Sequence, residues 1–121
     1  NPTIFYKAIS SGSEYDEQLK EIFFKNNILS EKEIFYELAI KDVKDACDIF
    51  MGIYQESNGD DGYVSIEIDP HLAYDTEGTI VEATKLFERC GKANIMIKVP
   101  ATKEGIFAIE ELIYKGVNIN A

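Results

Sequence analysis

The second half of the chain alternates short β-rich runs with amphipathic helical runs, and this order constrains the fold more than any other feature. The predicted strands are YVSIEID at 63–69, NIMIKVP at 94–100 and VNINA at 117–121. Between them lie TEGTIVEATKLFERCG and TKEGIFAIEELIYKG, each with the length and apolar spacing of one helix. Strands joined by a helix pair in parallel, so the pattern predicts an α/β fold of the βαβαβ type.

The first half of the chain predicts helices. Its apolar residues recur at helical spacing in four successive runs, with an expected break near Lys41 and Asp42. The sequence contains no repeat and no linker rich in Pro or Gly. We therefore predict a single fragment over 1–121, with a helical segment at 1–57 and a βαβαβ segment at 63–121.

Polar residues mark the expected helix starts. Ser13 precedes a run with acidic residues in its first turn, and Ser30 with Glu33 has the spacing of a capping box. Thr76 and Thr102 stand where the two crossover helices begin. We expect each Ser and Thr to cap its helix through the side-chain oxygen.

Each predicted strand has one apolar and one polar face, because alternate side chains point to opposite sides of a sheet. A sheet covered by helices on both faces has continuous hydrophobic strands instead. The apolar face carries Val64, Ile66, Ile68, Ile95, Ile97, Val99, Val117 and Ile119. The polar face carries Ser65, Glu67, Asp69, Met96, Lys98, Pro100, Asn118 and Asn120.

Two architectures fit this polar face. One is a two-layer domain with a solvent-exposed face, and the other is a partial (β/α)₈ TIM barrel whose inner face holds a site near the carboxyl ends of the strands. Glu67, Lys98 and Asn120 lie late in their strands, where such barrels build their sites. The positions favour the barrel.

Lys98 places an ammonium group within the apolar run IMIKVP, where desolvation is costly. The interior of a barrel favours the neutral amine, which can add to a ketone, form a Schiff base and use the protonated imine as an electron sink. Glu67 can transfer protons through a water if a gap of several ångströms separates the two side chains. If they touch, a plain Lys-Glu ion pair on a solvated face is the alternative, and spacing alone leaves both open.

The composition argues against several partners. The chain has 22 acidic and 12 basic residues and a net charge of -10, which disfavours binding to nucleic acid. It has no apolar run long enough to span a membrane and no signal-peptide pattern at its start, so we expect a cytoplasmic protein.

Metal and thiol chemistry are also disfavoured. His71 is the single histidine, so the sequence offers no zinc cluster built on histidines, and we expect no metal site. Cys47 and Cys90 stand apart in apolar helical runs and are predicted to be buried, reduced thiols.

Four segments resemble the successive signatures of transaldolase. They are NPT at the start, DGYVSIEIDPHLAYDT at 61–76, IMIKVPATKEGIFAIEEL at 95–112 and GVNINA at the end. The resemblance covers the chain from Asn1 to Ala121 in family order. Because the chain opens on Asn-Pro and ends within an alternating run, we expect a central fragment of a longer protein.

The resemblance implies a (β/α)₈-barrel enzyme of the pentose phosphate pathway that uses class I aldolase chemistry without a metal or organic cofactor. Such enzymes transfer a dihydroxyacetone unit from a ketose phosphate, either fructose 6-phosphate or sedoheptulose 7-phosphate, to an aldose phosphate. On this resemblance Lys98 forms the Schiff base, Glu67 works with a catalytic water, and Asn1 and Asn120 bind substrate. The predicted strands correspond to the third, fourth and fifth of the barrel.

Other family residues fall outside the sequence, so we expect the fragment by itself to turn over poorly. They are the aspartate of the first strand and, after Ala121, a threonine, a serine and a phosphate-binding arginine. Lys103 also stands where many relatives carry Trp. One alternative is a lyase similar to fructose-6-phosphate aldolase, a type that favours glutamine at the position of Glu67. The other is a non-catalytic α/β fragment that self-associates through its strand edges.

Overall fold

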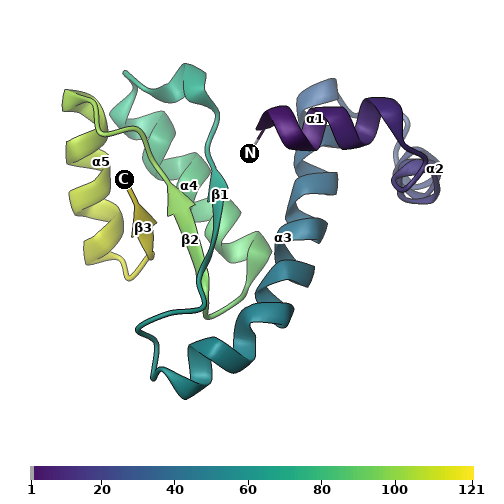
Figure 1. The fold of residues 1–121 in the computed structure, drawn as a ribbon. Coiled ribbons are helices and arrows are strands. Elements are labelled where there is room, and N and C mark those ends of the chain that lie inside the picture. The colour runs from purple at the N-terminus through teal and green to yellow at the C-terminus, as the bar shows by residue number, and fades with distance from the viewer. Residues whose placement is uncertain (1) are drawn as a thin grey trace. The chain divides into compact units, whose positions relative to one another are not determined.

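The computed structural model describes residues 2–121 and divides into two compact units, residues 1–39 and residues 40–121. The boundary falls within the long helix α3 (Glu31–Glu56) (Figure 1). The first unit is helical, and the second contains the whole sheet with its crossover helices.

The first unit contains α1 (Pro2–Ser11), α2 (Asp16–Lys25) and the start of α3. The ring of Phe5 lies edge-on to Tyr15 at 5.4 Å and to Phe35 at 5.3 Å between ring centroids, which joins the three helical segments through aromatic contacts. These ring contacts pack α1 against the turn before α2 and against the first part of α3.

The predicted capping box at the start of α3 is confirmed. The amide of Glu33 donates to Ser30 Oγ at 3.2 Å, and the amide of Ser30 donates to Glu33 Oε2 at 2.7 Å. The predicted cap at Ser13 is wrong, because α2 begins after Tyr15, whose side chain makes no capping bond. The carbonyl of Ser13 accepts from the amide of Asp16 in a turn before the helix.

The break expected near Lys41 and Asp42 is absent from α3. Lys41 Nζ pairs with Asp45 Oδ2 at 2.7 Å, one turn further along, and the helix has neither Gly nor Pro around this position. The two charged residues that suggested a break therefore lie on the surface of a continuous helix.

The second unit is built on three parallel strands in the order β1-β2-β3, which confirms the predicted α/β fold (Figure 1). The strands are β1 (Val64–Glu67), β2 (Ile95–Lys98) and β3 (Ile119–Asn120). The crossovers contain α4 (Thr76–Cys90) and α5 (Lys103–Tyr114), and the short 3₁₀ helix η1 (Pro70–Leu72) follows β1. The regular strands are shorter than the apolar runs that predicted them.

The apolar face of the sheet forms the core of this unit. Buried side chains from the strands and from the residues that flank them are Ile66, Ile68, Ile95, Ile97, Val99 and Val117. The crossover helices contribute buried Ala83, Leu86, Ala108 and Leu112. Burial of each large aliphatic side chain is worth about 1.5–3 kcal/mol, so the apolar face holds the helices on one side and leaves the polar face open.

The starts of α4 and α5 are capped and tied to each other. Thr102 caps α5 as predicted, since its Oγ1 accepts from the amide of Gly105 at 2.9 Å. The cap of α4 is Asp75, which accepts from the amide of Gly78, so the assignment to Thr76 is wrong by one residue. Thr76 Oγ1 instead donates to the carbonyl of Glu104 at 2.9 Å and links the first turns of the two helices.

Gly105 allows the loop after β2 to pack closely on α5. A Cβ atom at this position would lie 1.9 Å from the carbonyl oxygen of Pro100. Such a distance is far inside van der Waals contact, so any side chain would force the end of β2 away from the helix.

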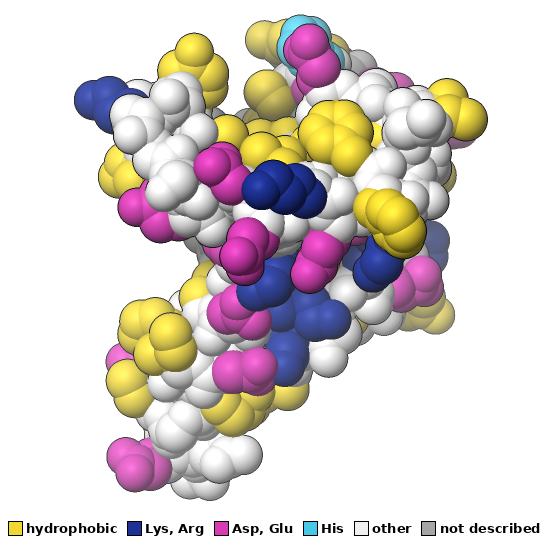
Figure 2. Space-filling model, turned by 90° about the vertical axis from the view of Figure 1, so that its right-hand side faces the viewer, with side chains coloured by type: hydrophobic (Ala, Val, Ile, Leu, Met, Phe, Trp, Pro, Cys, Tyr) yellow, Lys and Arg dark blue, Asp and Glu magenta, His cyan; other side chains and the backbone are white. Residues whose placement is uncertain are grey.

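Charges of both signs are mixed on the surface. On the face shown in Figure 2, Lys and Arg side chains lie among Asp and Glu side chains. Two ion pairs of the second unit join Lys92 to Asp48 and Lys115 to Glu111. Within residues 2–121, no helix combines the length and hydrophobicity that a membrane span requires.

Candidate active site

Three polar side chains stand at the same level on neighbouring strands of the sheet. Glu67 of β1 pairs in register with Lys98 of β2, and Lys98 pairs with Asn120 of β3. The alternation of each strand places them opposite the buried Ile66 and Ile97. The row lies at the carboxyl ends of β1, β2 and β3, which is the edge where (β/α)₈ barrels carry their sites.

Lys98 and Glu67 form a direct ion pair, with 3.1 Å between Nζ and Oε1. The gap for a bridging water that we expected between them is therefore not present in this arrangement. The structure contains the alternative that the spacing left open, a direct Lys-Glu contact. An ion pair this exposed contributes about 0–1 kcal/mol to stability. Stability therefore does not explain why Lys98 and Glu67 are placed together.

Lys98 is not buried in this chain, whereas the burial that we expect belongs to the interior of a closed barrel. The side chain of Lys98 is 50% exposed and that of Glu67 is 42% exposed. The physical reason is that three strands form an open sheet, whereas exclusion of water from a barrel interior requires the ring of strands to close. The three polar side chains are thus aligned on the sheet, but no closed barrel excludes water from them.

Asn120 points across the sheet toward β1. Its Nδ2 donates to Ser65 Oγ at 3.0 Å, although β2 lies between the two strands. Sequence reasoning placed Ser65 on the polar face but did not single it out. The available signal was its position two residues before Glu67, which puts both side chains on one face. Asn1, the other expected substrate-binding residue, lies outside the described residues.

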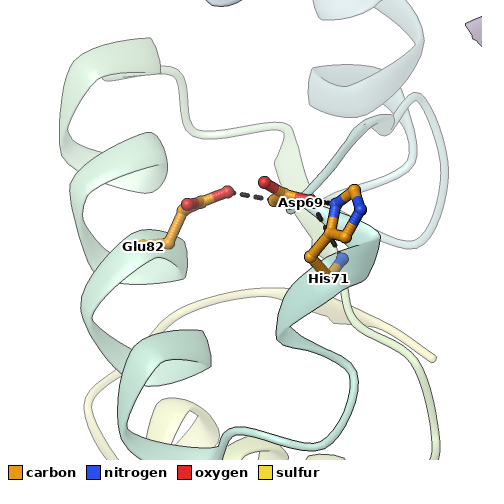
Figure 3. Close-up of polar contacts among 3 residues, drawn as sticks. All are labelled: Asp69, His71 and Glu82. Carbon is orange, nitrogen blue, oxygen red and sulfur yellow. Dashed lines mark hydrogen bonds and ion pairs between the residues drawn. The ribbon is translucent and has the colours of Figure 1, made fainter. Parts of the chain in front are cut away.

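The loop after β1 is held by a chain of polar contacts (Figure 3). The amide of Asp69 donates to Glu82 Oε1 at 2.7 Å, and Asp69 Oδ1 accepts from the amide of His71 at 2.9 Å. His71 Nδ1 lies 2.8 Å from the same carboxylate oxygen. Figure 3 shows Glu82 reaching from α4 to one side of Asp69 and His71 on the other side. These contacts fix the backbone that follows Glu67.

The loop after β2 is anchored to the loop after β1. Thr102 Oγ1 donates to the carbonyl of Ala73 while it caps α5. The strands that carry Glu67 and Lys98 therefore end in two loops that are bonded to each other. A rigid support of this kind keeps the side chains of Glu67 and Lys98 at a constant separation.

The two cysteines take no part in this row. Both are free and buried, as predicted. Burial raises the pKa of the Cys47 thiol, and burial together with Cys47 raises the pKa of the Cys90 thiol to about 11. Protonated thiols of this kind pack as small apolar groups and are poor nucleophiles. Among residues 2–121, no group of three or more His, Cys, Asp or Glu residues is arranged to hold a metal ion.

An amine beside a carboxylate at the ends of parallel strands has a defined chemical capacity. The amine can add to a carbonyl carbon, and the carboxylate can receive or return the protons that imine formation moves. Comparison with known proteins is consistent with this capacity. The family model described as Transaldolase/Fructose-6-phosphate aldolase matches residues 1–121.

The chain belongs to this family.

Several transaldolases are similar to the chain over nearly all of its length. The transaldolase of Trichodesmium erythraeum (strain IMS101) is 45% identical over 121 residues, which cover 99% of the chain and 31% of that relative. That of Arthrobacter sp. (strain FB24) is 43% identical over 120 residues, covering 99% and 32%. That of Thiobacillus denitrificans (strain ATCC 25259 / T1) is 40% identical over 121 residues, covering 99% and 33%. The chain spans about a third of the length of these curated relatives.

Membership of the family accounts for the open sheet. The helices and the three parallel strands are consistent with part of a transaldolase-type (β/α)₈ barrel, as the sequence predicted. In such a barrel the crossover helices lie outside and the opposite face of the sheet lines the interior. The face that carries Glu67, Lys98 and Asn120 is the one opposite the buried apolar side chains.

Proposed function

We propose that this chain is the Schiff-base portion of a transaldolase that transfers a dihydroxyacetone unit from a ketose phosphate to an aldose phosphate. The observation that supports it is the position of Lys98, which stands between Glu67 and Asn120 on the polar face, in register with both. Family membership makes this row the candidate site, and the 3.1 Å contact gives the amine a proton acceptor.

In the proposed reaction, the neutral amine of Lys98 adds to the ketone carbon of fructose 6-phosphate or sedoheptulose 7-phosphate. Loss of water gives a protonated imine, which accepts the electron pair released when the neighbouring carbon-carbon bond breaks. The leaving aldose departs once its hydroxyl proton has been removed, and an enamine remains on Lys98. Addition of this enamine to an acceptor aldehyde, followed by hydrolysis, restores the lysine.

Glu67 would move protons in these steps. At 3.1 Å from Nζ its carboxylate can take the proton that Lys98 must lose before it attacks. In a closed barrel, the attached substrate would separate the two groups and leave room for a water through which Glu67 acts. We assign substrate binding to Asn120 and Asn1, no cofactor, and the pathway and compartment expected from the resemblance, the pentose phosphate pathway and the cytoplasm.

The isolated chain would turn over poorly on this proposal. It spans about a third of the relatives it matches, and its sheet has three strands, so substrate bound at Lys98 would remain open to water. Water that reaches the site hydrolyses reactive intermediates. Activity is therefore expected of the full-length protein, meaning a chain that carries these residues together with the rest of the barrel.

Borohydride trapping tests the proposal. Full-length protein is mixed with fructose 6-phosphate, reduced with borohydride, digested and mapped by mass spectrometry. We expect a stable adduct on Lys98 and none on Lys115, a matched control that also pairs with a glutamate and is 46% exposed. Lys98→Met should abolish both adduct and turnover. Labelling of another lysine, or an active protein without an adduct, would overturn the mechanism.

A lyase similar to fructose-6-phosphate aldolase is the second candidate, because the matching family model covers both activities. The two differ in their need for an acceptor. A transaldolase holds the three-carbon unit on Lys98 until an aldose phosphate arrives, whereas the lyase releases dihydroxyacetone. We expect release of glyceraldehyde 3-phosphate from fructose 6-phosphate to depend on added erythrose 4-phosphate. Equal rates with and without this acceptor would favour the lyase.

A further inference from the structure

Ser65 and Asn120 are joined across an intervening strand. Asn120 Nδ2 donates to Ser65 Oγ at 3.0 Å, and β2 lies between β3 and β1 in the sheet. Neighbouring strands are about 4.8 Å apart, so the two backbones are separated by about twice that distance. Two short side chains can meet over such a span only when both lean inward above β2, as on the inner face of a curved sheet.

The register fixes where the amide of Asn120 lies. Asn120 is level with Lys98, whereas Ser65 is level with Met96, two residues earlier on β2. The hydrogen bond therefore runs diagonally over β2, between the positions of Met96 and Lys98. It directs the amide of Asn120 toward the amino-terminal side of Lys98, its register neighbour on β2.

We propose that Ser65 is a positioning residue that holds the amide of Asn120 beside Lys98, so that the amide contacts the hydroxyl groups of the dihydroxyacetone unit attached there. The inference rests on the proposed function, since it takes Lys98 as the point of attachment. It goes beyond that function because it assigns the orientation of Asn120 to a residue on another strand.

The chemistry of the two side chains suits this role. An amide has two N–H donors and an oxygen acceptor, and the bond to Ser65 uses one donor. The second donor and the oxygen can then face a polyhydroxylated ligand. A free Asn side chain would sample several rotamers, and it would have to lose that freedom each time substrate binds. β3 is a two-residue strand at the edge of the described sheet, so few backbone hydrogen bonds hold it. The side-chain bond from Asn120 to Ser65 therefore adds to its attachment.

The test uses four variants of the full-length protein, Ser65→Ala, Ser65→Thr, Asn120→Ala and the double variant Ser65→Ala/Asn120→Ala. We expect Ser65→Ala to lower kcat/KM roughly tenfold, because a small misplacement of a substrate-contacting group costs one to two orders of magnitude. Ser65→Thr keeps the hydroxyl and should restore most of the loss. In the Asn120→Ala background, Ser65→Ala should have little further effect.

Three results would overturn the inference. They are an unchanged kcat/KM in Ser65→Ala, an equal loss with and without Asn120, and a failure of Ser65→Thr to recover activity. If Ser65→Ala does not fold, as judged by circular dichroism, Ser65→Cys replaces it, since a thiol of similar size is a much weaker hydrogen-bonding group.

The borohydride adduct separates this inference from the proposed function. Ser65→Ala should still be labelled on Lys98, because the amine itself is unchanged. Absence of the adduct in the unaltered protein would remove the proposed function. If the adduct is present and Ser65→Ala has an unchanged kcat/KM, only the positioning role is removed. Ser13→Ala, in a turn of the first unit, is the control serine and should leave kcat/KM unchanged.

Discussion

The side-chain amide of Asn94 donates a hydrogen bond to the carbonyl oxygen of Cys47 at 2.8 Å, across 47 positions of the chain. The same nitrogen donates to the carbonyl of Gly62 at 2.9 Å, and the side chain is fully buried. One residue before β2 thus binds both α3 and the segment that enters β1. The hydrogen bonds of Asn94 therefore hold together the starts of β1 and β2, the strands that carry Glu67 and Lys98.

We predict that Asn94→Ala strongly destabilises the fold. The change removes a fully buried amide with two hydrogen bonds, each worth about 0.5–1.5 kcal/mol, and takes away the donor that it supplies to the carbonyl of Gly62. The expected loss in free energy of unfolding is about 2–4 kcal/mol, measured by urea denaturation of the full-length protein. Asn118 is the matched control, since it also donates to two carbonyls but is only partly buried. Equal losses for Asn118→Ala and Asn94→Ala would contradict the prediction.

The pKa of Cys90 predicts how stability depends on alkaline pH. Burial and the neighbouring Cys47 raise the pKa of this thiol from 9.0 to about 11. The folded protein therefore keeps a proton between pH 9 and 11 that the unfolded chain releases, so this contribution to stability is complete below pH 9 and declines as the pH rises toward 11. The decline for one thiol is about 1.4 kcal/mol per pH unit.

Cys90→Ala isolates the effect of this thiol. Other groups also titrate in the alkaline range, so the measured quantity is the difference in slope between the two proteins. We expect urea midpoints to fall more steeply with pH in the unaltered protein than in Cys90→Ala. Parallel curves would show that the thiol ionises equally readily in both states.

Glu67→Gln is predicted to lower turnover without unfolding the protein. On the proposed mechanism, the glutamine amide cannot accept the proton that Lys98 loses, and removal of a general acid-base group costs about 10²- to 10⁴-fold in kcat. Stability should change by less than about 1 kcal/mol, because the ion pair is exposed. Glu111→Gln breaks a similar pair with Lys115, at 3.2 Å, and should leave kcat unchanged. A normal kcat in Glu67→Gln would exclude the proton-transfer role.

Alanine substitution is predicted to lower stability at Ser30 but not at Ser13, although both residues precede helices. Ser30→Ala removes the oxygen that accepts from the amide of Glu33 and should cost about 1 kcal/mol. Ser13 makes no cap, so Ser13→Ala should be within about 0.5 kcal/mol of the unaltered protein. Chemical denaturation of the two variants provides the comparison, and a larger loss for Ser13→Ala would mean that the order is reversed.

The isolated chain is predicted to self-associate. In the described sheet β1 and β3 each have one neighbouring strand, so each presents a row of backbone groups along its outer side. Light scattering over micromolar concentrations should show species larger than a monomer, and a Pro replacing Ile119 should reduce them by removing a donor from β3. A monomer at all concentrations would remove self-association as a function of this chain.

The sequence predicted the sheet well because its signals were local and repeated. Alternation of Ile66, Ile97 and Ile119 with Glu67, Lys98 and Asn120 assigned the faces, and the helical runs between them specified parallel pairing. The capping box at Ser30 and the cap at Thr102 were likewise visible as short spacings. Such patterns can be recognised in the sequence without knowledge of the tertiary contacts.

Features that depend on tertiary contacts were missed. The choice of Asp75 over Thr76 as a cap depends on Thr76 being drawn to the carbonyl of Glu104 in another helix. The bond from Asn120 to Ser65 joins residues 55 positions apart and depends on how the sheet curves. The exposure of Lys98 depends on how many strands surround it, which alternation within one strand does not encode.

The close approach of Gly105 to Pro100 bears on protein engineering. On the proposed function, attempts to alter the range of accepted sugars would target the segment from Lys98 to the first turn of α5, but this segment has no volume to spare at Gly105. Libraries that randomise this position would yield misfolded variants. Lys103, an exposed residue two positions earlier at the start of α5, is the place where new side chains can be introduced without displacing the strand.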